Sequence, residues 1–134
     1  MNISSYDDLI NAAKQQAEPQ RLLFVFAAAG LPDDPTADQK ERFRSGKGGV
    51  LSPVMCVDKL PDEAGSFSGL VEESRQTGMG WDVVFVASLS GRAGIAPNSN
   101  EAEQPLTMMV EAVQNGAIAN FLAFNRDGEP IQLF

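Results

Sequence analysis

The sequence contains no histidine and a single cysteine, Cys56. Without imidazole, the Ser-His-Asp and Cys-His arrangements of nucleophilic catalysis cannot be built, because both use histidine as the base. Zinc sites that contain histidine or several cysteines are excluded as well, and any metal would need carboxylate ligands. One cysteine cannot form an intramolecular disulfide, which suits a reducing compartment. We therefore predict a cytoplasmic protein without a resident metal or cofactor.

Long apolar runs are also missing. The longest, about Leu22 to Ala29, is far shorter than the ~20 residues that a membrane-spanning helix needs. The beginning of the sequence, MNISSYDDLI, has no basic region followed by an apolar stretch, as a secretory signal would. We expect no contact with a membrane.

Basic residues are scarce: 10 lysines and arginines stand against 18 acids, which gives a formal net charge of −8. Such a surface repels phosphate backbones, so we expect no nucleic-acid partner. The charge favours solubility and leaves the docking of a basic partner open. The one local basic cluster is RFRSGKGG, Arg42 to Gly49, which indicates a solvated helix end more readily than a phosphate contact.

The 134 residues, 43% of them hydrophobic, fit a single domain, residues 1–134, with one core. Helical spacing and capping residues predict helices in SSYDDLINAAKQQAEP after Ser4 or Ser5, over about Ala37 to Ser45, in SFSGLVEESRQTG after Ser66, and from Pro105 to Asn115-Gly116. Apolar runs predict strands at Arg21 to Ala28, Val50 to Asp58 and WDVVFVASL, and AIANFLAFNRDGEPIQLF predicts a C-terminal β-hairpin that turns at Asp127-Gly128.

Helices and strands alternate along the sequence, with crossovers of roughly 20 residues, which is typical of βαβ units. We therefore predict an α/β domain with a mainly parallel sheet, helices packed on it in two or three layers, and a last strand antiparallel to its neighbour. Pro53 cannot donate to a sheet ladder. The second strand is therefore expected at an edge, or bulged at Pro53, or paired only after it.

In parallel sheets, ligands bind beyond the carboxyl ends of the strands. That rule collects polar residues from three strand ends: Asp58 and Lys59, then Ser88, Ser90 and Arg92, and finally Arg126. One hypothesis is a pocket for a small anion or carboxylate with Arg92 as a bidentate donor, and the other is a set of solvated loop residues. The glycines of SLSGRAG fit an amide nest for phosphate or an ordinary turn, and turns are the commoner use.

Cys56 lies between Met55 and Val57 in the middle of a predicted strand. A reactive thiol needs a nearby cation or a helix N-terminus, and Lys59 is expected on the opposite face of the strand. We therefore predict that Cys56 packs as a small hydrophobic residue.

Five segments, ISSYDDLINAA, AEPQRLLFVFA, PVMCVDK, VFVASLSGRAG and FLAFNRDGEP, together resemble a family of short, mostly uncharacterised bacterial proteins. The resemblance spans essentially the whole chain. Some members carry a label that links them to the large subunit of ribonucleotide reductase, and the motifs imply no catalytic residue. That reaction uses a thiyl-radical cysteine and a redox cysteine pair, so one cysteine excludes ribonucleotide reduction by this chain alone.

Two hypotheses about function result. The first is a small non-catalytic binding or accessory protein that partners itself, as a homodimer through an edge strand or the hairpin, or partners another protein. The second is a small-anion or carboxylate-binding protein or enzyme that uses the strand ends around Arg92, with a lysine or carboxylate as the base. They differ in whether Asp58, Ser90, Arg92 and Arg126 surround one concavity.

Overall fold

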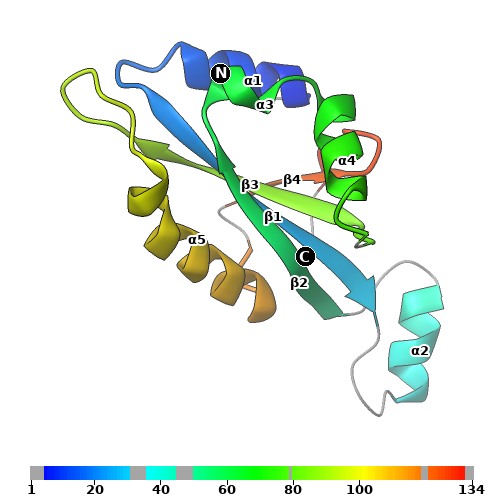
Figure 1. Cartoon of the computed structure of the whole chain (residues 1–134). Helices are drawn as coiled ribbons and strands as arrows, with labels where there is room; N and C mark the ends of the chain where they lie inside the picture. Colours follow the sequence, from blue (N-terminus) through cyan, green and yellow to red (C-terminus); the bar gives the residue numbers. More distant parts are fainter. Residues whose placement is uncertain (1–4, 31–35, 45–49, 79, 119–120, 132–134) are drawn as a thin grey trace.

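In the computed structural model, the described residues are 5–30, 36–44, 50–78, 80–118 and 121–131. Four strands form one sheet in the order β2-β1-β3-β4, and all neighbouring strands are antiparallel. The strands are β1 (Gln20–Gly30), β2 (Val50–Lys59), β3 (Val83–Ser90) and β4 (Leu122–Asn125). The helices are α1 (Tyr6–Lys14), α2 (Ala37–Arg44), α3 (Pro61–Ala64), α4 (Phe67–Arg75) and α5 (Ser99–Gln114). Figure 1 shows α1, α3 and α4 on one face of the sheet and α5 on the other.

The predicted mainly parallel sheet is wrong, and α2 shows why. A helix between two strands makes them parallel only when it crosses a face of the sheet and buries an apolar stripe there. α2 lies between β1 and β2, but Ala37 and Phe43 are its only apolar residues. Figure 1 places α2 beyond the end of the sheet, and β2 returns directly beside β1.

Alternation along the strands divides the core between the two faces of the sheet. Leu22, Phe24 and Phe26 of β1 belong to the cluster under α1, α3 and α4, together with Trp81 and Phe124. The intervening side chains of β1 belong to the second cluster, where they meet the apolar face of α5. Both faces of β1 are therefore buried, which explains its continuous apolar sequence.

The helix starts follow capping chemistry. Ser5 and Ser66 accept hydrogen bonds from the amides of Asp8 and Gly69, as expected for the caps of α1 and α4. α5 begins at Ser99 and not at Pro105, since Asn98 and Glu101 form a capping box at that earlier position. The short helix α3 was not predicted from the sequence.

The C-terminal hairpin is present in its described part. Phe124 of β4 forms an antiparallel bridge with Pro130, and the turn between them includes Gly128 with a φ of 81°. The Asn125 side chain accepts from the amides of Asp127 and Glu129, which holds this turn. Residues 119–120 and 132–134 of the predicted hairpin lie outside the described residues.

Candidate functional site

The carboxyl ends of β2 and β3 lie at the same end of the sheet. Both strands run opposite to β1, which separates them, so they are parallel to each other. Lys59 and Ser88 are register partners of the same residue, Leu22. Asp58, Lys59, Ser88 and Ser90 therefore lie at the same end of the sheet, on two strands that β1 separates, although the sheet is antiparallel.

Arg126 lies at the opposite end of the sheet, because β4 runs against β3. Its guanidinium lies over the Trp81 ring, 5.1 Å from the centroid, and donates to the Trp81 carbonyl at 3.4 Å. These contacts stabilise the beginning of the segment that leads into β3. The structure thus separates Arg126 from the other five predicted site residues.

The remaining predicted site residues do not all lie on the same face of the sheet. The Lys59 ammonium lies 2.9 Å from the Glu73 carboxylate of α4, and the Ser90 hydroxyl accepts from the Gln20 side chain at 2.9 Å. Asp58 lies on the opposite face, under the beginning of α5. Ser90 and Arg92 line one depression, whereas Asp58 and Arg126 are not among the residues that line it.

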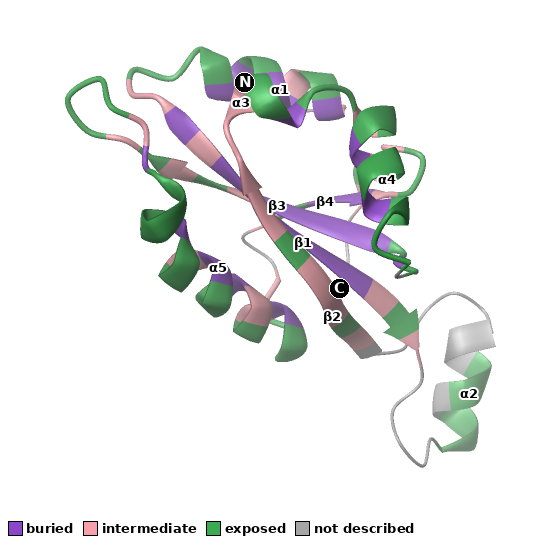
Figure 2. Ribbon diagram, in the orientation of Figure 1, coloured by how far each residue is buried: buried purple, intermediate pink, exposed green. Residues whose placement is uncertain are grey.

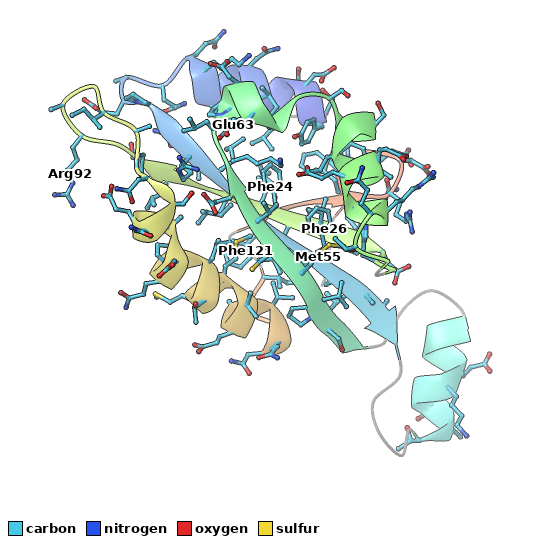
Figure 3. All side chains as sticks on the ribbon, viewed as in Figure 1. Phe24, Phe26, Met55, Glu63, Arg92 and Phe121 are labelled. Atoms are coloured by element: carbon cyan, nitrogen blue, oxygen red, sulfur yellow. The ribbon has the colours of Figure 1, made fainter. Side chains whose placement is uncertain are left out.

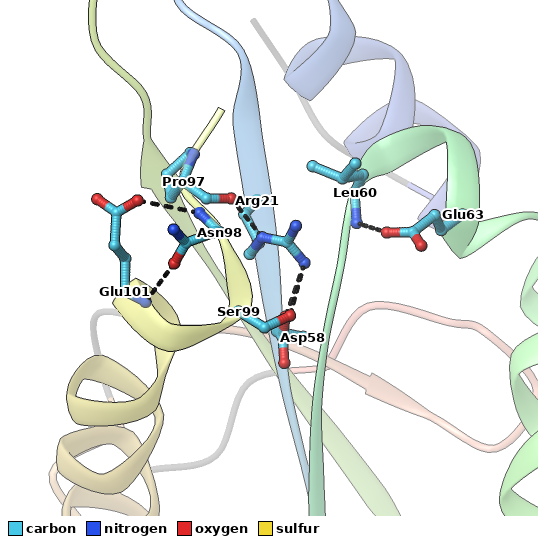
Figure 4. Close-up of polar contacts among 8 residues, drawn as sticks. All are labelled: Arg21, Asp58, Leu60, Glu63, Pro97, Asn98, Ser99 and Glu101. Atoms are coloured by element: carbon cyan, nitrogen blue, oxygen red, sulfur yellow. Dashed lines mark hydrogen bonds and ion pairs between the residues drawn. The ribbon is translucent and has the colours of Figure 1, made fainter. Parts of the chain in front are cut away.

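Asp58 belongs to a polar cluster that was not predicted from the sequence, shown in Figure 4. Arg21 of β1 donates to the Asp58 carboxylate at 2.7 Å and, through Nε, to the carbonyl of Pro97. The Ser99 hydroxyl donates to the same Asp58 oxygen at 2.8 Å. A lone arginine at the start of an otherwise apolar strand was the available signal, because a charge there needs a partner.

SLSGRAG forms a tight turn. Arg92 and Ile95 exchange two backbone hydrogen bonds of 3.0 and 2.9 Å, and Ala93 and Gly94 take φ values of 52° and 78° between them. The amide of Gly94 donates to the Glu18 carboxylate at 2.9 Å. These amides already donate hydrogen bonds within the protein. The segment is therefore an ordinary turn and does not form an amide nest for phosphate.

The depression beside this turn has a volume of about 420 Å³. It lies between the turn and the first residues of α5, and Glu101 contributes a carboxylate to its lining. Arg92 is exposed, and Figure 3 shows its side chain extending away from the sheet. The depression therefore has one cation at its rim and one acid in its wall.

β2 is an unusually exposed strand. None of its residues from Leu51 to Lys59 is buried, whereas β1 is buried without interruption from Leu22 to Ala27, as Figure 2 shows. The sheet order makes β2 an edge strand, and its register with β1 shifts beside Pro53, which confirms both the edge and the bulge expected there. No described residue pairs with its outer edge.

A groove of about 210 Å³ separates the second half of β2 from α4. Phe26 forms its floor and Met55, Val57, Leu70 and Thr77 contribute to its walls. Figure 3 shows Phe26 and Met55 on the side of the sheet that faces α4. We call this feature the β2–α4 groove.

The prediction that Cys56 packs as a small hydrophobic residue is wrong, because its thiol is exposed. The bulge at Pro53 does not change its side: Cys56 pairs with Val25, and Lys59 lies on the opposite face as expected. The edge position explains the exposure, since no described strand covers the outer side of β2.

Tyr6 has a clear pKa shift. Burial, with smaller contributions from the carboxylates of Asp7 and Glu73, raises the pKa of Tyr6 to about 12. Its ring packs edge-on against Phe67 at 5.3 Å between centroids. Tyr6 is therefore a neutral core residue at physiological pH and is unsuited to proton transfer.

No group of three potential acidic or cysteine metal ligands occurs among the described residues. The described helices include none that is both long and apolar enough to cross a membrane. Comparison with family models, with curated proteins and with solved structures gives no match to this chain.

Proposed function

We propose that this chain is a small cytoplasmic, non-catalytic binding module that adds an extended segment of a partner to the outer edge of β2. The observation that supports the proposal is the combination of a half-exposed apolar edge strand with the β2–α4 groove beside it. Peptide recognition by strand addition uses these two elements: main-chain hydrogen bonds give affinity, and pockets for alternate side chains give specificity.

The hydrogen-bonding pattern of β1 determines which backbone N–H and C=O groups of β2 point outward, away from β1. Gly91 donates to the carbonyl of Pro19 at 2.8 Å, so the backbone groups of Pro19 face β3. Because these groups alternate along a strand, those of Leu22 and Phe24 face β2.

Lys59 and Val57 are the register partners of those two residues, so their amides and carbonyls point at β1. The residues with outward-facing backbone groups are then Cys56 and Asp58. Pro53 and the bulge interrupt the first half of the strand. The part of β2 that can pair with another strand therefore runs from Met55 to Lys59.

The groove supplies the side-chain contacts. A strand that pairs with Met55 to Lys59 turns alternate side chains toward α4, because side chains alternate between the faces of a sheet. There they meet Met55, Val57 and Leu70, which are apolar, and the exposed end of Thr77. The groove therefore fits small or medium apolar side chains at alternate positions.

A library of displayed random dodecapeptides tests this function. Immobilised wild-type chain is expected to enrich extended peptides with alternating apolar residues. Cys56→Pro removes an outward N–H without loss of a bond to β1, so we expect enrichment to fall at least about tenfold. Cys56→Ala keeps the N–H and is the matched control. Equal enrichment by both variants, or none by a wild type that is monomeric, contradicts the proposal.

The second candidate function is the binding of a small anion at the depression, favoured by the placement of Ser90 and Arg92 on one concave surface. Inorganic phosphate is the probe. At 100 times its Kd it should raise the stability of the wild type by about 2.7 kcal/mol, seen as a higher melting temperature. Arg92→Ala should abolish the shift and Arg75→Ala, at an exposed arginine on α4, should retain it. An equal response of both variants contradicts an anion site at Arg92.

A further inference from the structure

We infer that the strand taken by the β2 edge is β2 of a second copy, so that the chain forms a two-fold symmetric dimer with one continuous sheet. This inference rests on the proposed function and names its partner. In Figure 1, β2 is the strand nearest the viewer. The described helices lie to either side of it, and none covers its outer edge. Two antiparallel β2 strands can therefore approach edge to edge.

The outward backbone groups select the register of this pairing. When Cys56 of one copy lies opposite Asp58 of the other, both outward residues of each strand are used. Each such pair exchanges two N–H···O bonds, so two symmetric pairs give four bonds. The axis then passes between the two copies of Val57.

Other symmetric registers are weaker. Placing Asp58 opposite Asp58 sets two carboxylates side by side, which is unfavourable on one face of a sheet. Placing Cys56 opposite Cys56 forms one pair only, because Asp58 then lies opposite Val54, in the bulge beside Pro53. The Cys56–Asp58 register is therefore the one in which hydrogen bonding and charge agree.

Side chains support the same register. The two Val57 residues form a pair without direct hydrogen bonds, in which Cα atoms are about 4.5 Å apart and side chains are in close contact. Val57 lines the β2–α4 groove and is only partly buried in the single copy. The dimer would cover this side chain and extend the core under α4 across the axis.

Charge along the sequence is complementary for an antiparallel pair. Residues 40–44 of α2, before β2, carry three basic residues and one acid. Residues 61–73, after β2, carry four acids and no base. An antiparallel arrangement brings the first segment of each copy toward the second segment of the other, so the ends attract despite the net charge of −8 on each chain.

Sedimentation equilibrium of the full chain tests the dimer. The wild type and Cys56→Ala are expected to have twice the mass of one chain at micromolar concentrations. Cys56→Pro removes one outward N–H from each copy, which should raise the dissociation constant at least about 30-fold. Circular dichroism establishes that the variant is folded. A wild type that stays monomeric, or a Cys56→Pro dimer of unchanged affinity, overturns the inference.

Cross-linking tests the register. In the double variant Cys56→Ala/Val57→Cys, the thiols of the two copies meet at the axis, within the Cα separation that a disulfide needs. Mild oxidation should convert most of this variant to a covalent dimer, and Cys56→Ala alone should give none. Absence of the cross-link in a dimeric sample overturns this register. Peptide enrichment by a monomeric wild type would refute the second copy as partner and leave the binding function standing.

Discussion

Gly91→Ala should lower the free energy of unfolding by about 3 kcal/mol, which is the upper end of the usual cost of overpacking. A Cβ atom at Gly91 would lie 2.1 Å from the carbonyl oxygen of Ile95 and 2.9 Å from that of Pro19. Both contacts are with backbone, which cannot rotate away as a side chain can. The added methyl group must therefore displace either the turn after β3 or the segment before β1.

Gly30→Ala is the matched control. Gly30 also lies at the end of a strand, a methyl group on its Cα would meet no atom of the described residues within 4 Å, and its φ is not positive. Alanine there should be neutral or slightly stabilising, since it restricts the unfolded chain. Denaturant unfolding of the two variants measures the difference. Equal stabilities would mean that the Gly91 turn adjusts freely and that its close approach to Pro19 is not required.

The close approach at Gly91 also shapes the depression. Gly91, Arg92 and Ile95 line it, and the hydrogen bond from Gly91 to Pro19 at 2.8 Å connects the turn to β1. A displaced turn changes the position of Arg92 relative to α5. Gly91→Ala should therefore weaken any anion binding at Arg92, in addition to its effect on stability.

Local features of the fold were predictable because they depend on a few neighbouring residues. Ser5 and Ser66 cap helices through their own hydroxyl groups, and the apolar run that became β1 is buried on both faces. The proline in β2 indicated an edge or a bulge, and both are present. The predicted start of α5 at Pro105 was wrong. The helix tolerates Pro105 in its interior, and the capping box of Asn98 and Glu101 was the stronger indication of where it begins.

Sheet direction was not predictable from the alternation of helices and strands. For β1 and β2 it depends on whether the helix between them packs on the sheet, and the polar sequence of α2 was the available indication that it does not. Between β3 and β4, α5 does pack on the sheet and the two strands are still antiparallel neighbours, so packing of the intervening helix does not by itself decide the direction. The outer edge of β2 and the β2–α4 groove both depend on the strand order β2-β1-β3-β4.

The candidate site was only partly predictable for the same reason. β2 and β3 end at the same end of the sheet because β1 runs between them in the opposite direction, so Asp58 and Ser90 share that end for a reason other than the one assumed, although they lie on opposite faces. Arg126 was placed with them only by the parallel-sheet rule. The partner of Asp58, Arg21, comes from the beginning of β1, which a parallel sheet would have placed at the opposite end.

Arg21→Met should lower the free energy of unfolding by about 3 kcal/mol. The Arg21 and Asp58 side chains are 12% and 20% exposed, so the ion pair is largely removed from water. Loss of one partner leaves the other as an uncompensated, mostly buried charge, which costs more than the pair itself contributes. The variant also removes the donor to the Pro97 carbonyl, just before α5.

Arg75→Met is the control for this substitution, because the Arg75–Glu72 pair is about two-thirds exposed on both sides and should contribute less than about 1 kcal/mol. Urea unfolding of the single variants and of Arg21→Met/Asp58→Asn measures the coupling. The double variant should recover part of the loss, since the carboxylate left unpaired by Arg21→Met is replaced by a neutral amide. Losses that simply add would contradict the pairing. Recovery would show that the charges are held as a pair, which keeps β1, β2 and the start of α5 together beside the proposed binding edge of β2.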